Sequence, residues 1–317
     1  MAAPLVIDPA LFEPAAISTE TLAVNADIIK RLNAEPPGLT IPEIRARRIA
    51  GIGAFPAAAK SPRAETMTIA GPSGPLELRI IAANNPRGLY FHIHGGGWSI
   101  GAPDQNDPLL ERIADVAGLT CVSVKYRLGP EFPYPAGPDD CEAAARWIVG
   151  EGSKHFGLSK LVIGGESAGG HLSAVTLLRL RDRHQLSPFS AALLNYGCFD
   201  LGMTPSARNW GEEKLVLNTP SILAFRKSFL PSDTDMSNPD VSPLYADLRG
   251  MPAAIFSVGT RDALIDDSLF MAPRWLASGN AAELAIYPGA CHGFLSLPNK
   301  QRNEAVACMS AFMDRYL

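Results

Sequence analysis

Short apolar runs alternate with amphipathic stretches from about residue 65 to the C-terminus. Several runs are continuously apolar, which is typical of strands in a parallel sheet that is covered on both faces. The pattern therefore predicts an α/β fold with a mostly parallel, doubly wound sheet flanked by helices. The expected strands are Leu78–Ala82, Leu89–His94, Leu119–Val124, Leu161–Ile163, Ala191–Tyr196, Ala253–Val258 and Leu284–Tyr287, and the expected helices are Leu109–Ala117, Asp139–Val149, Ala168–Arg181, Leu264–Ala277 and Asn303–Tyr316.

Residues 1–50 have a helical pattern that is separate from this alternation. Ser18 is the expected N-cap of a first helix, and Thr40 with Glu43 has the spacing of a capping box that opens a second. The second helix carries three arginines, which form either an anion site or, as we expect, a solvated face: Arg45, Arg47 and Arg48.

Residues 200–240 interrupt the alternation because they carry no strand pattern. Thr219 and Pro220 read as an N-cap followed by proline at the first position of a short helix. We expect this insertion and residues 1–50 to form a helical cap over one edge of the sheet. The core would then consist of residues 51–199 and 241–317.

The composition excludes several classes of protein. Of the 317 residues 47% are hydrophobic and 19% charged, and the net charge of −4 offers no attraction to nucleic acid or to an acidic membrane surface. The chain start lacks the features of a secretory signal, and no run of about 18 apolar residues predicts a membrane span. Five scattered cysteines without a C-x-x-C pair favour a reducing compartment, so we expect a cytoplasmic protein.

The strongest local motif is Gly165-Glu166-Ser167-Ala168-Gly169, between an apolar strand and a helical run. This is the G-x-S-x-G pattern in the strand–turn–helix context of a nucleophile elbow. Glycine at positions 165 and 169 would avoid collisions in the sharp turn, and Ser167 would stand at a helix N-terminus. A tightly packed turn without chemistry is the alternative.

A second motif, His94-Gly95-Gly96-Gly97-Trp98, follows an upstream strand. Successive glycines expose backbone amides that can stabilise the oxyanion formed when an acyl carbonyl is attacked. We expect the oxyanion hole at Gly95–Gly97 and Ala168, with the amides of Gly96, Gly97 and Ala168 as donors. His94 is expected to brace this loop.

The serine needs a base, and position favours His292 in the loop after the last strand. His171 lies one helical turn from Ser167, where packing is the expected role. Asp262, after the strand Ala253–Val258, is the best candidate for the acid that orients His292. The other candidates are acidic residues further along or in another loop: Asp266, Asp267 and, less favourably, Asp200.

These segments support each other because each follows a different predicted strand. The carboxyl ends of parallel strands form one edge of the sheet, where ligands bind. The chain order Ser167, Asp262, His292 is the order of α/β hydrolases. The sequence therefore predicts a serine hydrolase that forms an acyl-enzyme.

Further motifs match one family. From residue 76 to 317 the chain resembles the bacterial hormone-sensitive-lipase family of esterases (family IV). The resemblance implies an α/β-hydrolase fold with a helical cap, a carboxylesterase acting on small esters with short to medium acyl chains, the same triad and oxyanion hole, and no cofactor; it is compatible with a homodimer. Besides the segments above it rests on Tyr126–Glu131 with Pro133 and Pro135, Ser242-Pro243-Leu244, Asp262–Asp266 and His292-Gly293-Phe294.

The chain departs from the family pattern at three positions. Glu166 precedes the serine where the family usually has aspartate or threonine, Ala263 replaces a proline, and His171 stands where asparagine is common. These departures affect the expected pH profile and substrate range. An acyl or alcohol pocket is expected among aromatic residues that could equally fill the core: Trp98, Phe199, Trp210, Phe225 and Phe294.

Three other functions remain open from the residues. An amidase, arylformamidase or deacetylase would use the same triad. A small-molecule receptor on this scaffold, of the plant gibberellin-receptor kind, would have lost the base that His292 supplies. His92 and His94 share a strand face and could form a metal-binding H-x-H, although further ligands are missing, so no metal site is expected.

Overall fold

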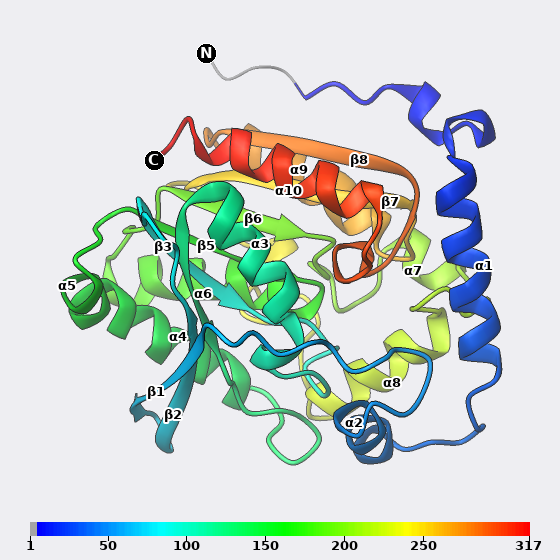
Figure 1. Ribbon diagram of the computed structural model, residues 1–317, viewed down its shortest axis with the longest axis horizontal. Coiled ribbons are helices and arrows are strands. Elements are labelled where there is room, and N and C mark those ends of the chain that lie inside the picture. Colours follow the sequence, from blue (N-terminus) through cyan, green and yellow to red (C-terminus); the bar gives the residue numbers. More distant parts are fainter. Residues whose placement is uncertain (1–4) are drawn as a thin grey trace.

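The computed structural model describes residues 5–317, and its centre is an eight-stranded sheet in the order β1-β2-β4-β3-β5-β6-β7-β8 (Figure 1). β2 pairs antiparallel with β1 and β4, and the strands from β4 to β8 pair in parallel. The strands are β1 (Ala64–Gly71), β2 (Gly74–Ile81), β3 (Gly88–Ile93), β4 (Leu119–Val124), β5 (Leu161–Glu166), β6 (Ala191–Asn195), β7 (Ala253–Arg261) and β8 (Ala282–Cys291).

Helices cover both faces of the sheet. α3 (Asp107–Ala117) and α10 (Lys300–Met313) pack on one face, and α4 (Ala136–Trp147), α6 (Ala168–His184) and α9 (Ile265–Ala277) pack on the other. Every residue of β3, β4, β5 and β6 is buried, which explains why these strands read as largely apolar runs without regular polar alternation. The short segments are α5 (Ser153–Phe156), a π-turn at Ile148–Gly152, and 3-10 turns at Pro9–Phe12, Pro14–Ala16, Pro103–Asn106, Pro243–Tyr245 and Phe294–Ser296.

All seven expected strands and all five expected core helices are present, but β1 was not predicted. β1 is mostly exposed and pairs only with β2, through a turn between Gly71 and Gly74. Such a strand lacks the continuous apolar run that marked the others, and only the alternation of Met67 and Ile69 with threonines could have revealed it.

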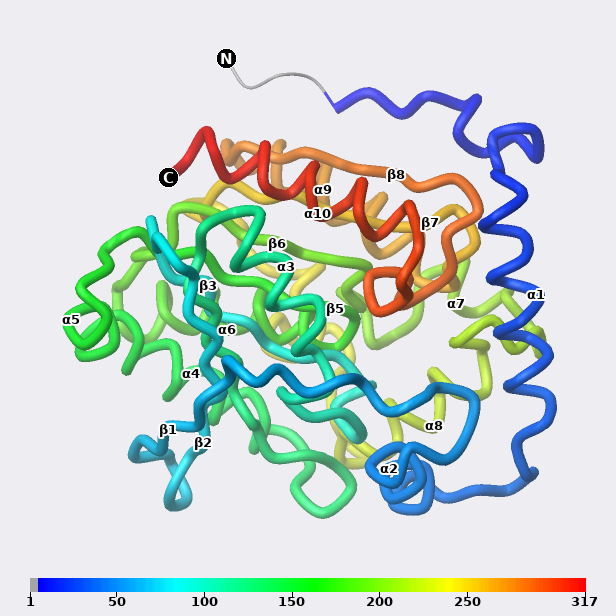
Figure 2. Tube along the Cα trace, viewed as in Figure 1, coloured from blue at the N-terminus to red at the C-terminus, as the bar shows by residue number. Residues whose placement is uncertain are grey.

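Four helices lie outside these layers, at the end of the sheet where β7 and β8 finish (Figures 1 and 2). They are α1 (Thr19–Asn33) and α2 (Ile41–Ile49) from the N-terminal segment, and α7 (Pro205–Asn209) and α8 (Thr219–Phe229) from the insertion. Ser18 caps α1, and Thr40 with Glu43 forms the expected capping box. The expected N-cap of α8 was wrong by one residue: the Asn218 side chain accepts from Ser221 N, and Thr219 is already helical.

Hydrogen bonds tie the N-terminal helices to the core. Asn25 of α1 donates to the carbonyl of Gly289, at 2.9 Å. Arg45 of α2 donates to the carbonyls of Ser99 and Gly129, and it forms a bidentate salt bridge with Glu131. Of the three arginines in this helix, Arg45 therefore attaches α2 to the core. Arg47 pairs with Glu35, and the Arg48 guanidinium lies over the ring of Phe55.

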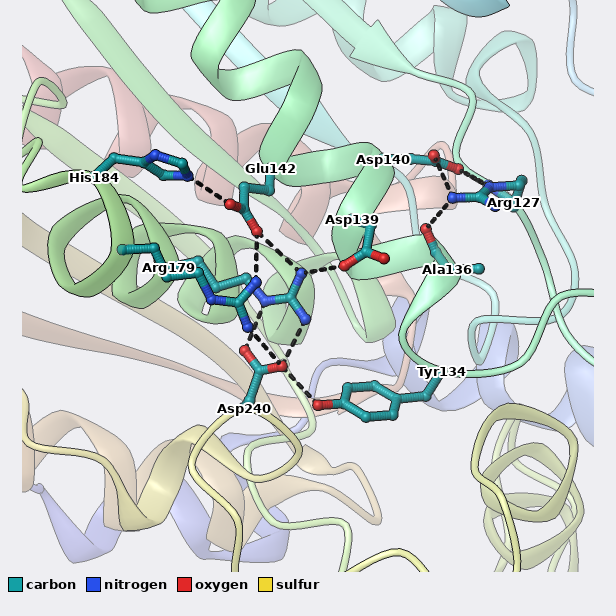
Figure 3. A network of polar contacts seen from close by, with 10 residues as sticks. Arg127, Tyr134, Ala136, Asp139, Asp140, Glu142, Arg179, His184 and Asp240 are labelled. Carbon is teal, nitrogen blue, oxygen red and sulfur yellow. Dashed lines mark hydrogen bonds and ion pairs between the residues drawn. The ribbon is translucent and has the colours of Figure 1, made fainter. Parts of the chain in front are cut away.

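A buried arginine connects the insertion to the core (Figure 3). The Arg179 side chain of α6 is 2% exposed and donates to both carboxylate oxygens of Asp240, at 2.5 and 2.6 Å. It also donates to Asp139 and Glu142 of α4, at 2.8 and 3.1 Å. The hydroxyl of Tyr134 donates to Asp240. These residues join two core helices to the end of the insertion.

Replacing Arg179 with methionine should lower the free energy of unfolding at pH 7 by about 3 kcal/mol, because it removes the buried cation and leaves Asp240 and Glu142 with the more exposed Arg183. Burial alone would raise the pKa of Asp240, but the hydrogen bonds and charge of Arg179 lower it below its ordinary value. A lowered carboxyl pKa contributes stability above about pH 4 and loses it as the pH falls further. The difference between the two proteins should therefore shrink below about pH 4, as urea denaturation would measure.

The matched control is Arg183→Met, because Arg183 contacts the same acids Glu142 and Asp240 but is 47% exposed. Solvent screens such a pair, so its loss should cost less than about 1 kcal/mol. Equal effects of the two substitutions would contradict the central place of Arg179 in this network.

Candidate active site

Ser167 lies in a strained turn between β5 and α6. Its φ of 57° and ψ of −119° are sparsely populated by residues with a side chain. A Cβ added to Gly165 or to Gly169 would collide with the same carbonyl oxygen, that of Ile93 on the neighbouring strand. The turn therefore requires glycine at both positions, and it leaves Ser167 half-exposed between buried neighbours.

The structure brings Ser167, His292 and Asp262 together. His292 follows β8, and its Nε2 lies 2.8 Å from the Oγ of Ser167. Its Nδ1 lies 2.9 and 3.0 Å from the two carboxylate oxygens of Asp262, which directly follows β7. Because a carboxylate only accepts, Nδ1 carries the proton and Nε2 is free to accept one from the serine. His292 is 4% exposed and Asp262 1%, so water hardly competes for these contacts.

The other acidic candidates bind elsewhere. Asp267 accepts from the amides of Phe199 and Asp200 and from the hydroxyl of Thr204. Asp266 accepts from the amide of Ser206, and Asp200 accepts from its own loop and from Tyr245. Asp262 is thus the carboxylate that reaches His292.

The glycine loop after β3 lies beside the elbow. An added Cβ at Gly95 would come within 2.6 Å of the carbonyl oxygen of Glu166, which shows how closely the two loops approach. Gly96 and Gly97 have φ values of 118° and 55°, in the region that favours glycine. Within residues 5–317 the amides of Gly96, Gly97 and Ala168 donate to no protein acceptor, so they are available to a bound group.

Two buried histidines support the glycine loop. His94 Nδ1 lies 2.8 Å from the Gly95 carbonyl, and its ring stacks on Tyr126. The Trp98 indole donates to Nδ1 of His171 at 3.0 Å, and Nε2 of His171 donates to the carbonyl of Val241 at 2.8 Å. Burial lowers the pKa of each histidine to about 4, so both rings are neutral at pH 7.

The bridging role of His171 was missed by sequence reasoning, which gave this residue packing alone. Val241 is the residue after Asp240, which Arg179 holds. His171 therefore links the glycine loop, through Trp98, to the end of the insertion. The departure from the family's asparagine was the available signal, but it did not identify the partners.

The aromatic pocket candidates lie in three different places. Phe199 and Phe294 are 0% and 1% exposed and pack on core rings, which is the place that filling the core would give them. Trp98 and Phe225 lie at the glycine loop, where an added Cβ on Gly97 would collide with the Phe225 ring. Trp210 is half-buried, with its indole donating to Glu213.

A narrow crevice adjoins Trp98 between the core and the insertion. Its free volume is about 10 Å³, which is at the limit for one water molecule. It is lined by Trp98, Cys198, Asp200, Leu201, Met203, Ala207, Ile222, Arg226 and Leu264.

The metal alternative finds no support in the geometry. Nδ1 of His92 contacts Ser123 Oγ and Nε2 contacts Glu166, so both ring nitrogens are engaged. No group of three or more metal-ligating side chains gathers among residues 5–317.

In the same range no helix is both long and apolar enough to cross a membrane.

Comparison with known proteins identifies the family. A family described as having the alpha/beta hydrolase fold matches residues 90–296. The carboxylesterase NlhH of Mycobacterium tuberculosis is 36% identical over 223 residues, which cover 68% of this chain and 69% of the relative. The chain belongs to the α/β-hydrolase family.

Other proteins that are similar to this α/β hydrolase are also named esterases or ester hydrolases. The carboxylic ester hydrolase LipN of Mycobacterium tuberculosis is 31% identical over 78% of the chain and 70% of its own length. The solved esterase of Pyrobaculum calidifontis superposes with a TM-score of 0.84, at 27% identity, over 94% of this chain and 98% of that one. The expected α/β-hydrolase fold and the resemblance to hormone-sensitive-lipase esterases are confirmed.

Proposed function

We propose that this α/β hydrolase is a serine carboxylesterase in which Ser167 is the nucleophile, His292 the general base and Asp262 the residue that orients it. One observation carries the assignment: an unbroken hydrogen-bonded chain runs from the Ser167 hydroxyl through His292 to Asp262. The relatives named carboxylesterase and carboxylic ester hydrolase support the ester as the bond that is cleaved.

The reaction proceeds in two halves. His292 Nε2 takes the Ser167 proton while Oγ attacks the ester carbonyl, and the imidazolium then protonates the departing alcohol. The product is an acyl-serine. Water enters, gives a proton to the same nitrogen and attacks the acyl carbon. The bond from that carbon to Oγ then breaks, the carboxylic acid leaves, and the imidazolium returns its proton to Ser167. Asp262 stabilises the positive charge that His292 carries between these steps.

The tetrahedral intermediate of each half carries a negative oxygen. The free amides of Gly96, Gly97 and Ala168 are the donors for this oxygen, because Ala168 directly follows Ser167, the glycine loop lies beside it, and none of the three has another acceptor within residues 5–317. One such donor is typically worth about 3 kcal/mol of transition-state stabilisation. The N-terminus of α6 adds its dipole at the same point.

Short acyl chains should be the preferred substrates. The crevice beside Trp98 has room for no more than about one water molecule, so an acyl chain that entered it would have to displace cap side chains. We expect kcat/KM for p-nitrophenyl acetate or butyrate to exceed that for the dodecanoate at least ~10-fold, equivalent to two methylenes left unburied. A series of p-nitrophenyl esters measures this.

Acetyl p-nitroanilide is the matched control, since it differs from the acetate ester only in the scissile bond. If the anilide were turned over at the rate of the ester, the proposed esterase activity would be wrong and the protein would be an amidase. A rate that rises steadily to the dodecanoate would contradict the short-chain preference but not the esterase.

Three further proposals concern the setting of the site. Residues 1–50 and 200–240 form the cap over a core of residues 51–199 and 241–317, which the positions of α1, α2 and α8 support. A cytoplasmic location is supported by five cysteines that are all free within the described range. A homodimer is suggested by the family resemblance, and light scattering on the purified protein tests it.

A further inference from the structure

The residue before the proposed nucleophile takes part in a buried pair. Oε2 of Glu166 lies 2.8 Å from Nε2 of His92, and Nδ1 of His92 lies 2.8 Å from Oγ of Ser123. The His92 side chain has no exposed surface and that of Glu166 is 6% exposed. The proposed ester hydrolysis uses neither residue.

The pair joins the two segments that must be held at a fixed distance for catalysis. His92 lies on β3, directly upstream of the glycine loop, and Glu166 is the last residue of β5, directly before Ser167. The two strands are adjacent and parallel, with Ile93 opposite Gly165. The side-chain bridge thus lies beside the point where the backbones of Gly95 and Glu166 meet.

The pair has few competing partners. Since a carboxylate only accepts, Nε2 of His92 is the donor. The other carboxylate oxygen, Oε1, is buried and has no partner within residues 5–317. Glu166 is therefore held to the protein by one strong bond, and its direction is set by His92.

We propose that His92 and Glu166 are a positioning pair that sets the distance between the Ser167 hydroxyl and the amides of Gly96 and Gly97. The inference rests on the proposed serine mechanism, but neither side chain contacts the substrate. The Glu166 carboxylate reaches across to β3, where it accepts from His92.

The test compares substitutions of Glu166 by glutamine and by leucine. Glutamine keeps an acceptor for Nε2 of His92, so kcat should stay within about threefold of wild type. Leucine fills a similar space but cannot accept, so kcat should fall about 10–100-fold with KM changed less than threefold, because a small displacement in a preorganised site has this effect. The Ki of a boronic acid that mimics the tetrahedral intermediate should rise by the same factor as kcat falls.

A double-mutant cycle completes the test. His92→Phe should match Glu166→Leu, and the two together should lose no more than either alone, because both break one contact. The double variant also leaves no unpaired buried carboxylate, which keeps the measurement feasible if a single variant folds poorly. Ser257→Ala is the control: its buried hydroxyl lies on a nearby strand, has no partner within residues 5–317, and should leave kcat unchanged.

The outcomes separate this inference from the proposed function. Full kcat in Glu166→Leu, additive losses in the double variant, or a loss in thermal stability without a change in kcat would each overturn the positioning pair. An active Ser167→Ala would instead overturn the serine mechanism on which the pair depends.

Discussion

Replacing Ser167 with alanine should lower kcat/KM for p-nitrophenyl acetate by about 10⁵–10⁶-fold, because the acyl-enzyme can no longer form. A small rate above the uncatalysed reaction should remain, since the oxyanion donors and the binding surface are untouched. Alanine removes only the Oγ atom that contacts His292, so the fold should be preserved. Steady-state kinetics with thermal melting of both proteins measures the two expectations.

Labelling identifies the nucleophile independently of rate. A p-nitrophenyl phosphonate should inactivate the wild-type protein with one adduct, which mass spectrometry of the peptides should place on Ser167. Ser278→Ala is the matched control, because the hydroxyl of this partly exposed serine at the end of α9 bonds only the carbonyl of Arg274. An adduct on another residue, or unchanged turnover in Ser167→Ala, would remove the triad from the mechanism.

Much of the fold was predictable because buried segments can be recognised in the sequence by their pattern of apolar residues. The strands from β3 to β6 are buried along their whole length, so each appears as a largely apolar run without regular polar alternation. The exposed β1 leaves no such trace. The start of α8 was misplaced by one residue because Asn218, Thr219 and Pro220 are all favourable near a helix start, and only the hydrogen bond to Ser221 distinguishes the cap.

The grouping of Ser167, His292 and Asp262 was predictable for a topological reason. Each follows the carboxyl end of a parallel strand, and such ends meet at one edge whatever the side chains between them. Sequence position alone ranked Asp262 above Asp266. In the structure Asp266 accepts from the amide of Ser206, so it is not the acid that contacts His292.

The side-chain partnerships behind the site were not predictable. Glu166 and His92 are 74 residues apart, Arg179 and Asp240 are 61 apart, and His171 contacts the carbonyl of a residue 70 positions away. No period or motif connects such residues, because their contact depends on which face of each strand or helix they occupy after packing. The sequence marked Glu166 and His171 only as departures from a family pattern.

Replacing Asp262 with asparagine should lower kcat about 10⁴-fold, with little change in stability. Oδ1 of Asp262 also accepts from the amide of Leu264 at 2.8 Å, so the carbonyl oxygen of an asparagine would keep that bond. Its NH₂ group would then face Nδ1 of His292. A donor at this place forces Nδ1 to accept, which moves the ring proton to Nε2 and removes the base from Ser167.

The control for this substitution is Asp266→Asn, because Asp266 is the neighbouring acid that the sequence ranked next and it accepts from Ser206 rather than from His292. It should keep kcat within about twofold. In Asp262→Asn, ¹⁵N spectra of His292 should show the proton on Nε2 instead of Nδ1, together with the lost rate. An unchanged tautomer with a lost rate would mean that the carboxylate acts through its charge, and an unchanged rate would assign the orienting acid to another residue.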